Sequence, residues 1–152
     1  IYSGTMSAAM EASIEGIHSI GFSLEDYAMD ANFDPGTPWI RLIIEHVLSN
    51  GLADSKLLNV NIPHSSLGPI RGMKICRQAE GRWEEEFVEG VDPRGQKFYW
   101  LTGNFATNDT VEGTDISALR EGFISIVPSS HDLTHHRAIP ALKSLESIKH
   151  IV

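Results

Sequence analysis

The chain has almost no cysteine, because Cys76 is the one thiol among 152 residues. A single cysteine excludes an internal disulfide framework and fits a reducing compartment, so we expect a cytoplasmic protein. Long apolar runs are also lacking, since glycine, asparagine or a charge interrupts each one well short of the roughly 20 residues that span a bilayer. The first residues show neither a basic segment nor a signal-like apolar core, and we expect no membrane partner.

Positive charge is scarce as well. The sequence has 12 lysines and arginines against 20 aspartates and glutamates, which gives a formal net charge of −8. No basic patch carries interleaved aromatic residues, so nucleic-acid binding through counterion release is not expected. An acidic protein can still bind a small phosphorylated molecule where a local dipole or a metal ion offsets the overall repulsion.

Several catalytic signatures are missing from the sequence. It contains no Gly-x-Ser-x-Gly elbow, Walker loop, dinucleotide fingerprint or His-Glu-x-x-His zinc helix. Cys76 lies in a strand-like run over residues 73–77, where a packed small hydrophobe is a simpler interpretation than a nucleophile.

The best candidate for a ligand site is Ser3-Gly4-Thr5, which directly precedes a helix-favouring stretch over residues 6–12. Ser3 and Thr5 have N-cap preference, and Gly4 lets the backbone approach a bound group closely. Free N–H groups at a helix start, together with the helix dipole, bind anions. The alternative is a plain helix cap, because many helices begin with Ser or Thr.

Two other polar clusters have simpler structural interpretations. His131, Asp132, His135 and His136 have ligand-like spacing, but cysteine and a second carboxylate are not near in sequence, so a hydrogen-bonded junction is favoured over a metal site. Gly113-Thr114-Asp115 is typical of a helix cap with its acid near the positive end of the dipole.

The spacing of apolar residues predicts one α/β domain over residues 1–152. We expect helices over 5–15, 37–50, 114–121 and from 138 onward, strands over 17–24, 57–63, 70–77, 83–91, 96–101 and 123–127, and a polar loop over 102–113. In this division 1–80 form part of an α/β core, 81–104 a protruding hairpin, and 105–152 a return strand and C-terminal helix.

The second predicted helix has particularly clear signals. Thr37-Pro38 is typical of a cap followed by proline at the first helical position, and Gly51 ends the helix. Its core-facing stripe is expected to contain Ile40, Ile43, Ile44, Val47 and Leu48.

The predicted hairpin favours an oligomer contact over a catalytic lid, because its tip has no candidate chemistry. The residues Asp92-Pro93-Arg94-Gly95 suit a type I turn between the two strands. The run Glu84-Glu85-Glu86 is expected on the solvated side of the hairpin. The arms nevertheless expose more apolar area than an isolated hairpin supports, which predicts packing on another subunit. The tail has one apolar stripe, which contains Ile139, Leu142, Leu145 and Ile148. This stripe needs a surface to pack on, either a neighbouring subunit or the core of the same chain.

Several short segments occur in a distinctive order. They are Tyr2-Ser3-Gly4-Thr5, Ala8-Ala9-Met10-Glu11, Leu58-Asn59-Val60-Asn61-Ile62-Pro63, Asp92-Pro93-Arg94-Gly95 with Tyr99-Trp100, Gly113-Thr114-Asp115, Glu121-Gly122-Phe123-Ile124-Ser125-Ile126 and Asp132-Leu133-Thr134. Together they resemble the SurE (survival protein E) family of metal-dependent nucleotidases.

The resemblance implies a phosphomonoesterase that acts on nucleoside monophosphates with a divalent cation, Mg²⁺ or Mn²⁺. It implies a Rossmann-like three-layer α/β fold, of which this chain is the C-terminal part, with a long β-hairpin and a C-terminal helix that build homodimers or homotetramers. Ser3, Gly4 and Thr5 match the phosphate-facing residues, and Gly113, Thr114 and Asp115 are expected near the site.

The family's metal ligands match no position of this chain. They are a paired Asp after the first strand, a Ser, and an Asn just before the Tyr-Ser-Gly-Thr segment, so we expect them upstream of Ile1. A parallel α/β fold normally begins with a strand, whereas this sequence begins with a helix, so we also expect the first strands of the fold upstream of Ile1. The 152 residues alone are therefore expected to have little or no phosphatase activity.

Two functions of other classes remain open at this point. The chain could be a non-catalytic assembly module whose Ser-Gly-Thr turn only caps a helix. It could also be a phosphate-binding domain without a hydrolytic step, which would bind phosphate without a divalent cation.

Overall fold

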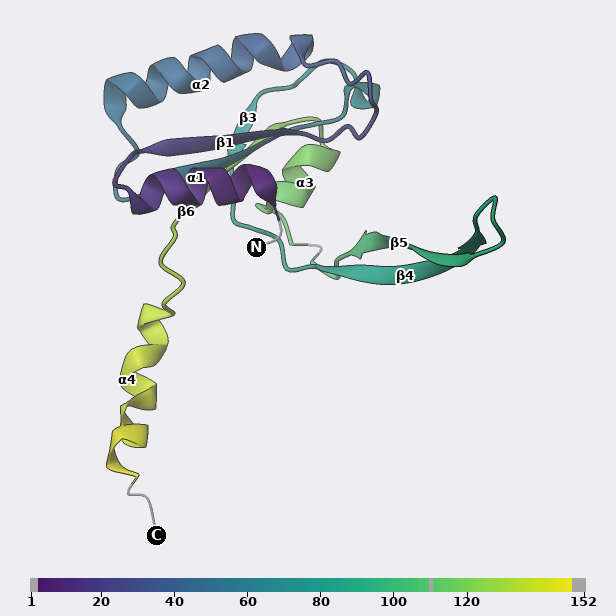
Figure 1. Ribbon diagram of the computed structural model, residues 1–152. Helices are drawn as coiled ribbons and strands as arrows, with labels where there is room; N and C mark the ends of the chain where they lie inside the picture. Colours follow the sequence, from purple (N-terminus) through teal and green to yellow (C-terminus); the bar gives the residue numbers. More distant parts are fainter. Residues whose placement is uncertain (1–2, 110, 149–152) are drawn as a thin grey trace.

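A computed structural model describes residues 3–109 and 111–148 (Figure 1). Tyr2, part of the segment that resembles the SurE family, lies outside the described residues. The elements are α1 (Gly4–Ile14), β1 (Ser19–Leu24), α2 (Thr37–Asn50), β2 (Leu57–Ile62), β3 (Met73–Ile75), β4 (Arg82–Val91), β5 (Lys97–Ala106), α3 (Asp115–Arg120), β6 (Ile124–Ser129) and α4 (Ile139–Leu142), with short 3₁₀ turns between some of them.

The body of the molecule is a mixed four-stranded sheet in the order β1-β2-β6-β3. β1 and β2 run parallel, β6 returns antiparallel to β2, and β3 pairs parallel with β6. Helices α1 and α3 pack on one face of this sheet, and α2 covers the other (Figure 1). The predicted three-layer α/β architecture is therefore confirmed.

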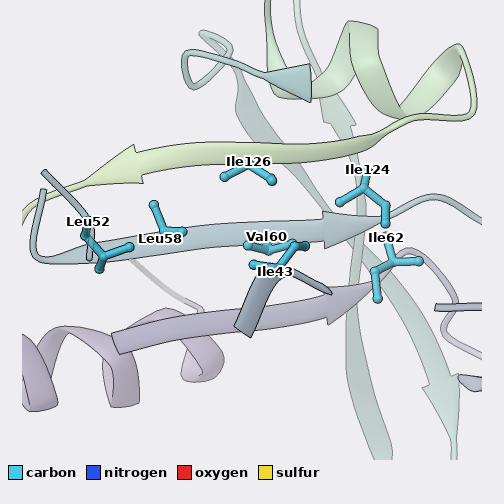
Figure 2. Packing of buried hydrophobic residues seen from close by; sticks show 7 residues of the cluster. All are labelled: Ile43, Leu52, Leu58, Val60, Ile62, Ile124 and Ile126. Atoms are coloured by element: carbon cyan, nitrogen blue, oxygen red, sulfur yellow. The ribbon is translucent and has the colours of Figure 1, made fainter. Parts of the chain in front are cut away.

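The main core lies between α2 and the sheet. Ile43 of α2 packs over alternate residues of the two central strands, as Figure 2 shows; the buried cluster contains Ile43, Leu52, Leu58, Val60, Ile62, Ile124 and Ile126. These strand residues point to one face because side chains alternate along a strand. Fully burying a Val or Ile side chain contributes about 1.5–3 kcal/mol, so burial of this layer stabilises the body.

Helix α1 forms and ends as its sequence predicts. The Ser3 side chain caps its first turn, and Gly16, with φ of +81°, follows the last turn in the left-handed conformation that glycine adopts without strain. Helix α2 also matches its predicted length, and Gly51 ends it at φ of +73°.

Two details of α2 were wrongly predicted. Its N-cap is Gly36 rather than Thr37, because a 3₁₀ turn over Asp34–Gly36 leads directly into the helix. The predicted five-residue stripe is confirmed only in part. Ile43 is buried and Ile40 and Val47 pack against the core, whereas Leu48 is 81% exposed. A helix that rests on a flat sheet buries only the narrow face that points down.

The hairpin is longer than its sequence suggests. β4 and β5 pair from Arg82 opposite Ala106 to Val91 opposite Lys97, so the predicted loop over 102–113 is wrong in its first part. Polar residues continue a strand here because the cross-strand pair of Trp83 and Phe105 extends the ladder. The predicted turn is present, since the Gly95 N–H donates to the Asp92 carbonyl at 2.9 Å.

β3 is shorter than the predicted 70–77 strand and ends at Ile75. β3 pairs with β6, which also pairs with β2 on its other side. Beyond β3 the chain no longer pairs with β6 as a strand, and Arg77 forms an isolated β-bridge with Thr114. Strand length here is set by the partner available, which a single segment of sequence does not reveal.

Two arms extend from the body, the β4–β5 hairpin and the C-terminal tail (Figure 1). The expected helix from Ala138 is broken into the single turn α4 between 3₁₀ turns over His136–Ala138 and Lys143–Ser147. The tail's four apolar stripe residues are exposed, so the stripe does not pack on the core of the described chain. Within the described ranges, no helix has both the length and the apolar content to cross a membrane.

Candidate functional site

The Ser3-Gly4-Thr5 turn forms the exposed start of α1. The Ser3 hydroxyl accepts a hydrogen bond from the Met6 N–H at 3.2 Å, and the Ser3 carbonyl accepts from the Ser7 N–H at 2.9 Å. The N–H groups of the first helical residues have no partner within a helix and point along its axis. Gly4 and Thr5 therefore present backbone donors at the positive end of an 11-residue helix.

Gly4 has a further property that bears on ligand binding. A Cβ atom added at Gly4 would meet no atom of the described chain within 4 Å. The fold does not require glycine at this helical position, so any requirement for it arises from a group that approaches from outside.

Helix α1 packs closely on β1 through Gly21. A Cβ at Gly21 would lie 2.9 Å from the Met6 Sδ atom and 3.3 Å from the Thr5 Cγ2 atom. Further along the helix, the Ser19 hydroxyl donates to the Ala9 carbonyl at 2.6 Å. These contacts hold the first turn of α1 against the sheet and set its direction.

The Gly113-Thr114-Asp115 loop caps α3. The Thr114 hydroxyl accepts from the Ser117 N–H at 3.1 Å, and the Ser117 hydroxyl accepts from the Thr114 N–H at 3.1 Å, which is a capping box. The Asp115 carboxylate accepts from the Ala79 N–H at 2.9 Å. Among the described residues, no hydrogen bond joins this loop to Ser3-Gly4-Thr5, and its place near the site stays a prediction.

Three residues of the histidine cluster make side-chain hydrogen bonds, in two separate places. His131 Nδ1 shares a 2.7 Å hydrogen bond with the Ser13 hydroxyl of α1, whereas His136 Nε2 lies 2.8 Å from the Asp132 carboxylate. Hydrogen bonds from Thr134, followed by the one from His136, hold the Asp132 pKa well below its usual range. The described ranges contain no group of three or more His, Cys, Asp or Glu residues able to hold a metal ion. The cluster therefore forms a hydrogen-bonded junction at the base of the tail.

Cys76 is buried, and its thiol donates to the Lys74 carbonyl at 3.4 Å. Burial raises the pKa of the Cys76 thiol, which disfavours the nucleophilic thiolate. The packed-hydrophobe interpretation is confirmed.

A hollow of about 680 Å³ lies at the base of the hairpin. Arg77 and Asp109 form part of its lining and bind each other through two hydrogen bonds of 2.7 and 2.9 Å. The guanidinium and the Glu80 N–H lower the Asp109 pKa to about 2. Arg82, Glu80 and Glu84 also line the hollow, so its acidic residues outnumber its arginines and it does not present the positive field that an anionic ligand needs.

One polar feature of the sheet was not predicted as a site. On the face toward α1 and α3, Ser23, Asn61, Ser125 and Lys74 stand in one register row across all four strands. The signal was present in Leu58-Asn59-Val60-Asn61-Ile62, where apolar and asparagine residues alternate. Alternation places asparagines on one face, but only the strand pairing shows which residues join them.

These features define a class of protein: a three-layer α/β domain with backbone donors at an exposed helix start, an arrangement used to bind phosphate groups. The family model of survival protein SurE matches residues 1–85, more than half of the chain. The chain belongs to the SurE family.

Known relatives cover almost the whole chain. It is 52% identical to 5'-nucleotidase SurE of Christiangramia forsetii, over 95% of this chain and 55% of the relative. It is also 52% identical to 5'-nucleotidase SurE of Flavobacterium psychrophilum, over 95% of this chain and 56% of that protein. The crystal structure of the SurE protein from Aquifex aeolicus superposes with a TM-score of 0.73 at 35% identity, over 96% of this chain and 58% of that one. The chain thus spans about 55% of the length of the curated relatives it matches.

Proposed function

We propose that this chain supplies the phosphate-binding part of a phosphomonoesterase that hydrolyses nucleoside monophosphates. The observation that carries the proposal is the start of α1, where Gly4 and Thr5 present backbone N–H donors and an added Cβ at Gly4 meets nothing in the chain. The names of the relatives, 5'-nucleotidase SurE, support the nucleotide as substrate.

In this proposal the helix start holds the phosphoryl group in line for attack. Fixed donors aimed at the phosphoryl oxygens stabilise the charge that they carry in the transition state, and a preformed turn supplies them without reorganisation. The Ser3 hydroxyl caps the helix and so keeps the Gly4 and Thr5 N–H groups in place.

The proposed reaction also uses a divalent cation, Mg²⁺ or Mn²⁺, which offsets phosphoryl charge when bound. The described residues do not fit such an ion, because they contain no cluster of three or more His, Cys, Asp or Glu residues that could ligate it. The part assigned to this chain is accordingly the binding and orientation of the phosphate.

The test compares phosphate release from a nucleoside monophosphate by this chain and by the full-length Christiangramia forsetii relative, with Mg²⁺, Mn²⁺ or EDTA. We expect an active, EDTA-sensitive relative and an inactive chain that still binds inorganic phosphate. Gly4→Ala is expected to weaken phosphate binding about tenfold and leave the unfolding temperature unchanged. Equal phosphate affinity in Gly4→Ala would contradict the proposed site.

A second proposal concerns assembly as a homodimer or homotetramer through the hairpin and the tail. It rests on the aromatic side chains that both hairpin strands expose, of which Trp100 is 67% exposed, and on the exposed tail residues Leu142 and Leu145. Sedimentation of the chain and of Trp100→Glu tests it. A dimer or tetramer that dissociates in the variant supports the proposal, and a monomeric native chain contradicts it.

A further inference from the structure

Helix α1 buries few of its side chains. Among its eleven residues, all within the described range, Ala9 and Ser13 alone are buried, and Ile14 is 59% exposed. The methyl group of an alanine contributes much less on burial than the side chain of a leucine or isoleucine. The polar contacts of α1 are therefore important for where the helix lies.

The polar contact at the end of α1 joins Ser13 to His131 at the base of the tail. Ser13 is 1% exposed, and its hydroxyl lies 2.7 Å from the Nδ1 atom of His131. A helical serine can instead donate to the carbonyl four residues earlier. For Ser13 that carbonyl belongs to Ala9, and it already accepts the Ser19 hydroxyl at 2.6 Å. His131 is thus the partner that satisfies this buried hydroxyl, although it lies 118 positions away in the sequence.

The Ala9 contact lies between the backbone donors at the helix start and Ser13. Since a helix rises 1.5 Å per residue, Gly4 lies about 7.5 Å before Ala9 and Ser13 about 6 Å after it. A rigid helix that turns about Ala9 moves both of its ends by similar distances. The first turn touches β1 at Gly21, and this steric contact limits movement toward the sheet but not away from it. A displacement at Ser13 therefore reaches the donors at the helix start nearly undiminished.

We propose that His131 is a positioning residue for phosphate binding: through Ser13 it fixes the far end of α1 and so the direction of the donors at the helix start. This inference rests on the proposed function, in which those donors hold the phosphoryl group. Hydrogen bonds weaken steeply as donor and acceptor lose alignment, so a small turn of the helix weakens all the bonds at its start together. His131 acts only through the helix, because its partner Ser13 lies about 14 Å along the axis from Gly4.

The test measures the affinity of the chain for inorganic phosphate by isothermal titration, at a temperature where thermal unfolding shows every variant to be folded. His131→Ala removes the partner of Ser13, whereas His131→Asn retains a carboxamide that can take the place of Nδ1. His135→Ala is the matched control, because His135 is an exposed histidine of the same segment. The backbone N–H resonances of Gly4 and Thr5, recorded by NMR without phosphate, report the position of the helix start independently of binding.

We expect His131→Ala to bind phosphate about fivefold more weakly and to shift the Gly4 and Thr5 resonances, and His131→Asn to recover most of the affinity. Adding Ser13→Ala to His131→Ala should cost little more, because both changes remove the same bond. His135→Ala should leave the affinity and the resonances unchanged.

The outcomes separate this inference from the proposed function. Unchanged affinity or unchanged resonances in His131→Ala, or no recovery in His131→Asn, overturns the inference and leaves the proposed function standing, since the native chain binds phosphate in each case. A native chain that does not bind phosphate overturns the proposed function, and the inference falls with it.

Discussion

Arg77 binds Asp109 through two parallel hydrogen bonds, from Nη1 to Oδ2 at 2.7 Å and from Nη2 to Oδ1 at 2.9 Å. The Asp109 side chain is only 6% exposed and also accepts from the Glu80 N–H at 3.0 Å. The bidentate pair therefore joins the segment that enters the hairpin to the segment that leaves it, and fixes the direction in which the hairpin extends.

This pair predicts a specific acid sensitivity. The Asp109 pKa of about 2 in the folded state lies below the value of about 4 of an unfolded aspartate, so the carboxylate stabilises the fold above pH 4. That contribution is lost as the pH falls from about 4 to about 2. Asp109→Asn should lower stability at pH 7 and flatten the acid limb of the unfolding profile between these values. Glu85→Gln, on the exposed hairpin, is the control, and an unchanged limb in Asp109→Asn would contradict the assignment.

Thr114 predicts the cost of losing a helix cap. Its side chain is fully buried and accepts the Ser117 N–H, so Thr114→Ala leaves that donor without its partner. We expect Thr114→Ala to lower the free energy of unfolding by about 1–2 kcal/mol, measured by urea denaturation. Thr114→Ser retains the hydroxyl and should lose less than half as much. Equal losses in the two variants would assign the effect to packing of the Thr114 methyl group.

The bond between Ser13 and His131 predicts coupling between α1 and the base of the tail. Ser13 is 1% exposed, and its hydroxyl lies 2.7 Å from His131 Nδ1. Ser13→Ala should lower the free energy of unfolding by about 1 kcal/mol and speed hydrogen exchange in residues 130–136. Ser7→Ala removes an exposed hydroxyl of the same helix and should change neither measurement. If exchange in the tail base stays the same in Ser13→Ala, the bond does not couple the two segments.

The close contact at Gly21 predicts that the position of the first turn of α1 depends on its packing against β1. Gly21→Ala would place a Cβ 2.9 Å from the Met6 Sδ atom, which can turn away, and 3.3 Å from the Thr5 Cγ2 atom, which is held by the helix. We expect the first turn of α1 to shift by a few tenths of an ångström and phosphate affinity to fall several-fold, with a loss of stability near 1 kcal/mol. Unchanged phosphate affinity, with the stability loss present, would argue against phosphate binding at this turn.

Local signals in the sequence were sufficient for the elements that short-range bonds define. Helix α1 begins after Ser3, whose hydroxyl accepts a hydrogen bond from the Met6 N–H three residues later. The helix ends before Gly16, because glycine adopts a positive φ without strain. The hairpin turn at Asp92–Gly95 and the alternation in β2 are equally local. The backbone donors of the Ser3-Gly4-Thr5 turn belong to this class, because a helix start carries its donors with it, and phosphate binding there stays a prediction.

Relations between distant segments were decided only in the tertiary structure. Ser13 and His131 are 118 positions apart, and Arg77 meets Asp109 across the whole hairpin. β5 extends to Ala106 because β4 offers a ladder, and Leu48 stays exposed because α2 rests on one narrow face. The polar row needs the register of four strands at once, since a shift of one residue would turn Asn61 to the opposite face. The sequence by itself thus determined the family and, within it, helix α1 and the donors at its start, because α1 depends on bonds within a few residues. The pairing of the strands decided which polar side chains share one row of the sheet, because it sets which residues lie opposite one another.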